Sequence, residues 1–89
     1  MITVAVTHEV KDFPSWKKIF DSDKPRRDGA GVADKGIYAS VDDPNKLLLI
    51  FEAESDKTIQ GMFNDPELQQ LMKEAGVMSV PEMWTLNKG

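Results

Sequence analysis

Five consecutive apolar residues, Leu47 to Phe51, constrain the fold of this chain more than any other feature. They lie in a predicted strand, Lys46 to Glu54, where successive side chains point to opposite faces. Both faces of the strand are therefore apolar at its centre, as in strands that are buried on both sides. The fold has to cover this strand twice.

The chain has 89 residues, enough for one hydrophobic core, and we expect one domain over residues 1–89. Cysteine is absent, which excludes disulfides and thiolate chemistry and favours a reducing compartment. The net charge of -4 argues against nucleic acid as a partner. No apolar run approaches the roughly 20 residues of a membrane helix, and the first residues do not resemble a secretory signal. We expect a cytoplasmic protein that does not bind membranes.

The first half of the chain predicts a strand, a broken helix and a second strand. Residues 2–10 alternate with period two, which indicates a strand. Asp12 is a predicted helix cap, and apolar residues then recur at helical spacing. Pro25 breaks this helix, Ser22 or Asp23 can cap a short second piece through Arg27, and glycines 29 and 31 end it. Residues 32–41 predict the second strand, followed by a turn at Asp-Asp-Pro-Asn.

The second half repeats this pattern after its own strand. Ser55 and Asp56 are cap candidates for a helix that Asn-Asp-Pro interrupts, Asp65 caps the next piece, and Gly76 follows its end. Residues 80–86 predict the last strand. Ala-Gly-Val occurs twice, 45 residues apart, which indicates either a duplicated βαβ unit or chance.

The order βαββαβ predicts an α+β, ferredoxin-like fold. Right-handed crossovers place both helical segments on one face of a four-stranded antiparallel sheet, with the first and third strands central. The other face is open, yet the apolar strand needs cover there. The simplest cover is a second copy of the chain, so we predict a homodimer.

His8 is the one imidazole in the chain, and its position matches the parity of Val4 and Val6. A histidine at the mouth of a pocket could transfer a proton near neutral pH, whereas the alternative is a structural strand residue. His8-Glu9 does not begin a zinc motif, because that motif needs a second histidine one helical turn away. We predict no metal site and no cofactor.

Two other groups of residues have ordinary structural interpretations. Five basic residues between positions 17 and 27 are interspersed with acids, which favours a solvated helix face over an anion site. Glu52 and Glu54 share a strand face and are interpreted as a solvated pair.

Six aromatic side chains are candidates for an apolar pocket. Trp16, Phe20, Phe51 and Phe63 are more typical of the core. Tyr38 and Trp84 are better pocket candidates, because each carries a polar group that needs a partner when buried.

The whole chain resembles the dimeric α+β barrel superfamily in element order and length. The matching segments are Asp12 to Phe20, the Asp-Asp-Pro-Asn turn at 42–45, and residues 64–77. Members of that superfamily include stress-responsive proteins, polyketide cyclases, lactone isomerases, haem-degrading enzymes and antibiotic-biosynthesis-type monooxygenases. His8 is similar in location to the first-strand histidine of the stress-responsive and cyclase branch. The second helical segment has no histidine, which argues against haem, and the monooxygenase asparagine and tryptophan set has no residue-by-residue match.

The resemblance implies a homodimer that binds a small, partly aromatic molecule and performs cofactor-independent acid/base chemistry, such as cyclisation or isomerisation. In this hypothesis His8 moves the proton, Tyr38 donates a hydrogen bond to a developing oxyanion, and Trp84 forms an apolar wall, with Trp16 and Phe51 also contacting the ligand. The alternatives are a non-catalytic ligand-binding or regulatory dimer, and an interaction module without a ligand.

Overall fold

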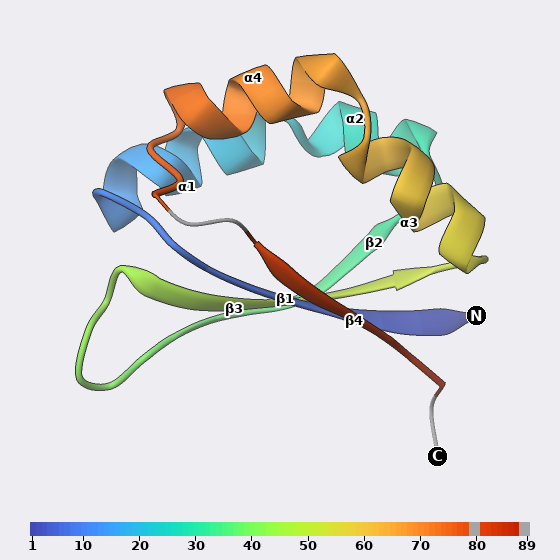
Figure 1. The fold of residues 1–89 in the computed structure, drawn as a ribbon, viewed down its shortest axis with the longest axis horizontal. Helices are drawn as coiled ribbons and strands as arrows, with labels where there is room; N and C mark the ends of the chain where they lie inside the picture. Colours follow the sequence, from blue (N-terminus) through green and yellow to red (C-terminus); the bar gives the residue numbers. More distant parts are fainter. Residues whose placement is uncertain (79–80, 88–89) are drawn as a thin grey trace.

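The computed structural model describes residues 1–78 and 81–87 and confirms the predicted element order. Figure 1 shows the elements coloured along the sequence, from blue at the N-terminus to red at the C-terminus. The strands and helices are β1 (Ile2–Glu9), α1 (Phe13–Ser22), α2 (Lys24–Gly29), β2 (Ala33–Ala39), β3 (Lys46–Ala53), α3 (Asp56–Phe63), α4 (Pro66–Glu74) and β4 (Glu82–Leu86).

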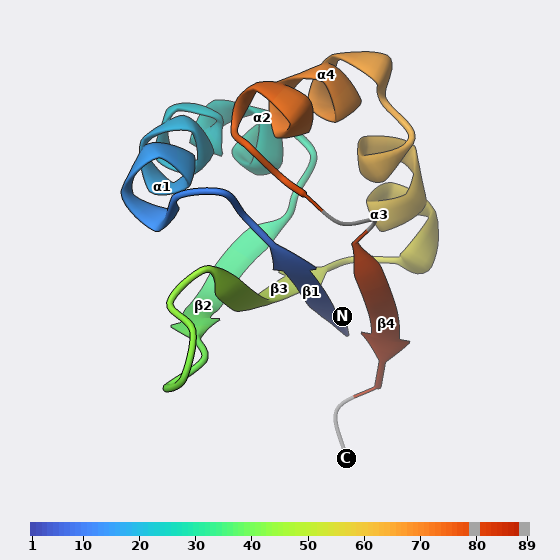
Figure 2. The same cartoon turned by 60° about the vertical axis from the view of Figure 1, so that its left-hand side comes forward.

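The sheet has the strand order β2-β3-β1-β4, and every pairing is antiparallel. β1 and β3 are central, as predicted, and Val4 lies opposite Phe51 in their register. All four helices cover one face of the sheet, and the other face has no covering layer in the described chain (Figures 1 and 2). The α+β, ferredoxin-like prediction is therefore confirmed.

The helix boundaries follow the capping residues. Asp12 accepts hydrogen bonds from the backbone nitrogen and the hydroxyl of Ser15, at 3.1 and 2.6 Å. Ser55 and Asp65 cap α3 and α4 in the same way. Gly76 follows α4 with φ of 82°, a left-handed conformation that favours glycine.

Several predicted details of the elements differ from the structure, and β1 and β3 each end one residue earlier than predicted. Asp23 is the N-cap of α2 but makes no capping hydrogen bond, because its carboxylate pairs with Arg26 instead. α2 continues through Gly29, and Gly31 is the residue with positive φ. β2 ends at Ala39, before the fully exposed Val41. Residue 80, the predicted start of the last strand, lies outside the described residues.

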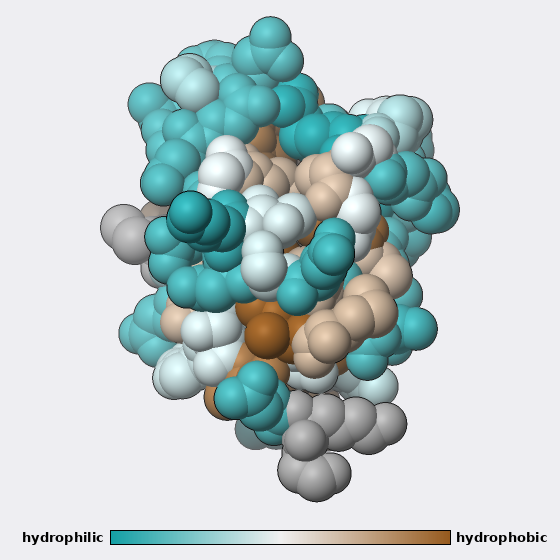
Figure 3. All heavy atoms as spheres, turned by 90° about the vertical axis from the view of Figure 1, so that its right-hand side faces the viewer, coloured by the Kyte–Doolittle hydropathy of each residue, from teal (hydrophilic) through white to brown (hydrophobic). Residues whose placement is uncertain are grey.

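The apolar segment of β3 divides between the two faces of the sheet. Leu47, Leu49 and Phe51 are buried beneath the helices, whereas Leu48 and Ile50 lie on the open face and are half-buried. Trp84 and Leu86 extend this open face on β4, and each is 47% exposed. Viewed from the side in Figure 3, the most hydrophobic visible surface lies low, at the level of the sheet, below largely hydrophilic helices. Within residues 1–78 and 81–87, no helix has the length and hydrophobicity to cross a membrane.

Candidate functional site

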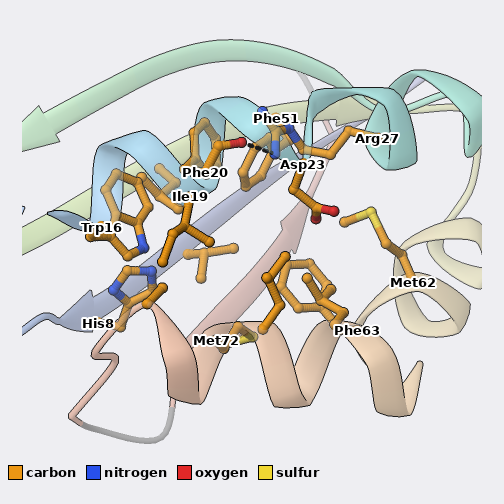
Figure 4. Close-up of a pocket in the computed structure, with 15 residues that line it drawn as sticks. His8, Trp16, Ile19, Phe20, Asp23, Arg27, Phe51, Met62, Phe63 and Met72 are labelled. Carbon is orange, nitrogen blue, oxygen red and sulfur yellow. Dashed lines mark hydrogen bonds between the residues drawn. The ribbon is translucent and has the colours of Figure 1, made fainter.

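A cavity of about 70 Å³ lies between the sheet and the helices (Figure 4). Its walls are mostly apolar side chains from β1, β3, α1, α3 and α4. Three lining residues carry ionisable groups: His8, Asp23 and Arg27. Mostly apolar walls with a few polar groups are the usual composition of a small-molecule site, so this cavity is the candidate site.

His8 contributes the unsatisfied polar group of the cavity. Strand alternation places it beside Val6 on the helix-facing side of β1, where the residue is only 8% exposed. Its Nδ1 atom is buried and has no hydrogen-bond partner among the described residues. Burial lowers the pKa of His8, so the imidazole is uncharged near pH 7. An uncharged imidazole with an unpartnered nitrogen is able to exchange a hydrogen bond or a proton with a ligand.

Aromatic rings form the wall next to His8. The Trp16 ring meets the imidazole in an edge arrangement, with ring centroids 5.6 Å apart. Trp16 stacks on Phe20 at 4.8 Å, and Phe20 contacts Phe51 at 6.2 Å. Trp16 and Phe51 are core residues, as their helical and strand patterns predicted, and both also line the cavity.

Arg27 lies at the end of the cavity near Phe20. Its guanidinium donates to both carboxylate oxygens of Asp34, at 2.8 and 3.1 Å, and to the backbone oxygen of Phe20 at 2.9 Å. It also lies over the Phe20 ring, 3.7 Å from the centroid. Arg27 is 4% exposed, so its assignment to a solvated helix face is wrong. The sequence holds no local signal for this burial, because Asp34 supplies the compensating charge from the next strand.

Asp23 borders the same end of the cavity and was also missed as a lining residue. Its side chain is 14% exposed and accepts a hydrogen bond from Nε of Arg26 at 3.1 Å. Figure 4 shows its carboxylate turned toward the side of Met62 and Phe63. Local sequence favoured a cap, whereas the other walls of the cavity that Asp23 lines come from distant elements, including α3 and α4.

Tyr38 and Trp84 lie on the open face of the sheet, opposite to the side chain of His8. Tyr38 pairs with Leu48, and Trp84 pairs with Ala5, so both point away from the helices. Tyr38 is 57% exposed. A groove of about 570 Å³ at this end of the sheet is bordered by both Tyr38 and His8, although alternation directs their side chains to opposite faces. The structure thus groups His8, Trp16 and Phe51, and separates them from Tyr38 and Trp84. The described residues include no group of three or more side chains suited to a metal ion.

Comparison with known proteins identifies the fold. No family model matches the chain, and no curated protein matches it. Among solved structures, a conserved protein from Methanosarcina mazei Go1 superposes with a TM-score of 0.74 at 15% identity, covering 99% of this chain and 92% of that one. A candidate antibiotic biosynthesis monooxygenase from Bordetella bronchiseptica gives 0.75 at 14% identity, covering 99% and 96%. An uncharacterised NIPSNAP domain protein from Burkholderia xenovorans gives 0.70 at 12% identity, covering 100% and 93%.

The chain therefore has a ferredoxin-like α+β fold. More specifically, it has the fold of the antibiotic biosynthesis monooxygenase-like structures, which is the fold that the resemblance stated above implied. Identities this low establish the fold alone, because the same fold supports many unrelated activities.

Proposed function

We propose that the chain forms a homodimer in which each subunit binds a small, partly aromatic molecule between its sheet and its helices, and that His8 performs cofactor-independent acid/base chemistry on it. The carrying observation is the buried, unpartnered Nδ1 of His8, a residue that lines a mostly apolar cavity. A buried polar atom without a partner costs about 1–3 kcal/mol, so its presence calls for a compensating role.

The chemistry follows from the environment of His8. Burial keeps the imidazole uncharged at neutral pH, which is the form that accepts a proton. The buried imidazolium that results is costly, and negative charge developing on the adjacent ligand would offset this cost. Cyclisation and isomerisation through an enolate both provide such charge. Several solved structures with this fold are named as monooxygenases, so turnover should be assayed with and without oxygen.

The size of the cavity sets a condition on binding. Its volume of about 70 Å³ is below the roughly 150 Å³ of an engineered apolar cavity that binds benzene. A ligand with an aromatic ring can therefore bind only if side chains of the cavity wall move. Met62 and Met72 line the cavity, and their flexible side chains are the wall groups best able to move.

The open face of the sheet supports the homodimer. Half-buried Leu48 and Ile50 and the half-exposed Trp84 form an apolar surface there, which a second sheet would cover. In this proposal Tyr38 and Trp84 serve the subunit interface. Light scattering at micromolar concentration should give twice the mass of 10.0 kDa, and Ile50→Glu should halve the measured value. Gln70→Glu, an exposed site on α4, should leave the mass unchanged.

Ligand binding is tested by NMR on the dimer. Small aromatic alcohols and ketones are titrated into protein with ¹⁵N-labelled histidine, and binding in the cavity should shift the imidazole nitrogens of His8. His8→Ala should abolish turnover of any substrate found. Binding without turnover would select the non-catalytic, regulatory alternative. If no compound shifts the His8 resonances, the proposed site is wrong.

A further inference from the structure

Neither basic group that lines the cavity offers a free positive charge to a ligand. His8 is uncharged near neutral pH because of its burial. Arg27 is held in a two-point ion pair by Asp34, which balances its charge. No other basic side chain lines the cavity in the described chain. An anionic ligand would therefore find no free cation inside.

The rim next to Asp23 carries an excess of negative charge. Arg26 pairs there with three carboxylates: Asp23 at 3.1 Å, Asp65 at 2.6 Å and Glu67 at 3.1 Å. One positive charge against three negative charges leaves a net charge of -2. The nearby lysines do not change this balance, because Lys17 and Lys24 are each paired with an aspartate on their own helix.

The ion-pair cluster meets the cavity at Asp23. Asp23 belongs both to the ion-pair cluster and to the cavity wall, and its carboxylate is mostly buried. Phe63 and Leu68, which lie two residues before and three residues after Asp65 in the sequence, also line the cavity. An anion bound in the cavity would lie near the carboxylate of Asp23 and would lose its own hydration, and both effects weaken binding.

We infer that the cavity selects uncharged or cationic small molecules and rejects carboxylates and other anions, with Asp23 as the main discriminating residue. This inference rests on the proposed ligand-binding function and adds the charge class of the ligand. Asp23 makes no capping hydrogen bond, and it is the one acidic residue among the described residues that line the cavity.

Three probes of matched shape test the inference: benzyl alcohol, benzylamine and benzoate. Binding is followed at pH 7 and low salt through the indole N–H resonance of Trp16, which lines the cavity. Benzoate should bind at least 10-fold more weakly than either of the other two. Higher salt should narrow this difference, because the rim is partly exposed to solvent.

Substitution of single acidic residues identifies which one is responsible for the weaker binding of benzoate. Asp23→Asn should reduce the discrimination against benzoate to less than about 3-fold. Asp28→Asn is the matched control, since Asp28 is an exposed acid on α2 that does not line the cavity. If Asp23→Asn does not fold, Asp65→Asn, which retains the ability to cap α4, should relax the discrimination partially.

The outcomes separate the two claims. Equal binding of all three probes, or equal relaxation by the Asp23 and Asp28 variants, would overturn the charge selectivity and leave the proposed function standing. If none of the probes shifts Trp16 while the protein is folded, the ligand-binding cavity itself is refuted, and the selectivity with it.

Discussion

Replacement of His8 by leucine should stabilise the protein while removing the proposed function. Leucine has a similar volume and carries no polar atom, so the substitution removes the buried Nδ1 that has no partner. Relief of an unsatisfied buried group is worth about 1–3 kcal/mol. Loss of the edge contact with Trp16 costs about 0.5–1.5 kcal/mol. The net expectation is a gain of about 1 kcal/mol in the free energy of unfolding, measured by urea denaturation at pH 7.5.

The matched control is His8→Gln, which keeps a polar group of similar size in the cavity and should not gain stability. If His8→Leu instead loses 1 kcal/mol or more, Nδ1 is satisfied in solution and the argument from the orphaned nitrogen fails. Stabilisation combined with loss of ligand binding would be the expected trade-off at a functional site.

The pH dependence of stability provides a second measurement on the same pair of proteins. Burial lowers the pKa of His8 in the folded state, so the unfolded chain binds more protons below the ordinary value of 6.5. The contribution of His8 to the free energy of unfolding is fully present above about pH 6.5. It is lost as the pH falls from there toward the lower pKa that His8 has in the folded state. The His8→Leu variant lacks this loss, and its stability advantage should therefore increase between pH 7.5 and pH 5.5. A constant difference across this range would contradict the burial of an uncharged imidazole.

Three further predictions concern the scaffold, and urea denaturation checks each of them. Gly76→Ala should destabilise the protein by about 1–2 kcal/mol, because φ is 82° and a new Cβ would lie 3.2 Å from Lys11 Cβ. The control is Gly61→Ala on α3, where the new Cβ meets open space and should stabilise the protein by about 0.5–1 kcal/mol. Equal effects of the two substitutions would contradict the positive φ of Gly76. Arg27→Met should destabilise by about 1–3 kcal/mol, because it removes the buried donor to the backbone oxygen of Phe20 and the ion pair with Asp34. A neutral result would mean that water replaces both contacts. Arg26→Gln should cost about 1 kcal/mol more than Lys24→Gln, which breaks one exposed pair, and the reverse order would refute the role of the three-carboxylate cluster.

The elements of this fold were predictable because their signals are local. Asp12, Ser55 and Asp65 precede their helices and supply the missing acceptors for backbone N–H groups of the first turn. Period-two alternation identified β1 and placed His8 on the same face as Val4 and Val6. The handedness of the crossovers then determined which strands are central.

The candidate site was predictable only in part. Alternation placed His8 and Phe51 on one face of the sheet, and the helical stripe directed Trp16 toward them. Tyr38 and Trp84 were grouped with them by chemistry, and strand register separates them, because a shift of one residue reverses the face. Arg27 was misassigned because its burial depends on Asp34, which is brought near by the turn after α2.

The sequence by itself determined the strands, the caps, the order of the elements and the apolar character of both faces of β3. These properties depend on periodicity and on hydrogen bonds between residues close in sequence, so short segments of the chain are enough to predict them. The tertiary structure decided which polar groups share the cavity. His8, Asp23 and Arg27 come from different elements, and their burial, pairing and charge balance exist only when sheet and helices pack together.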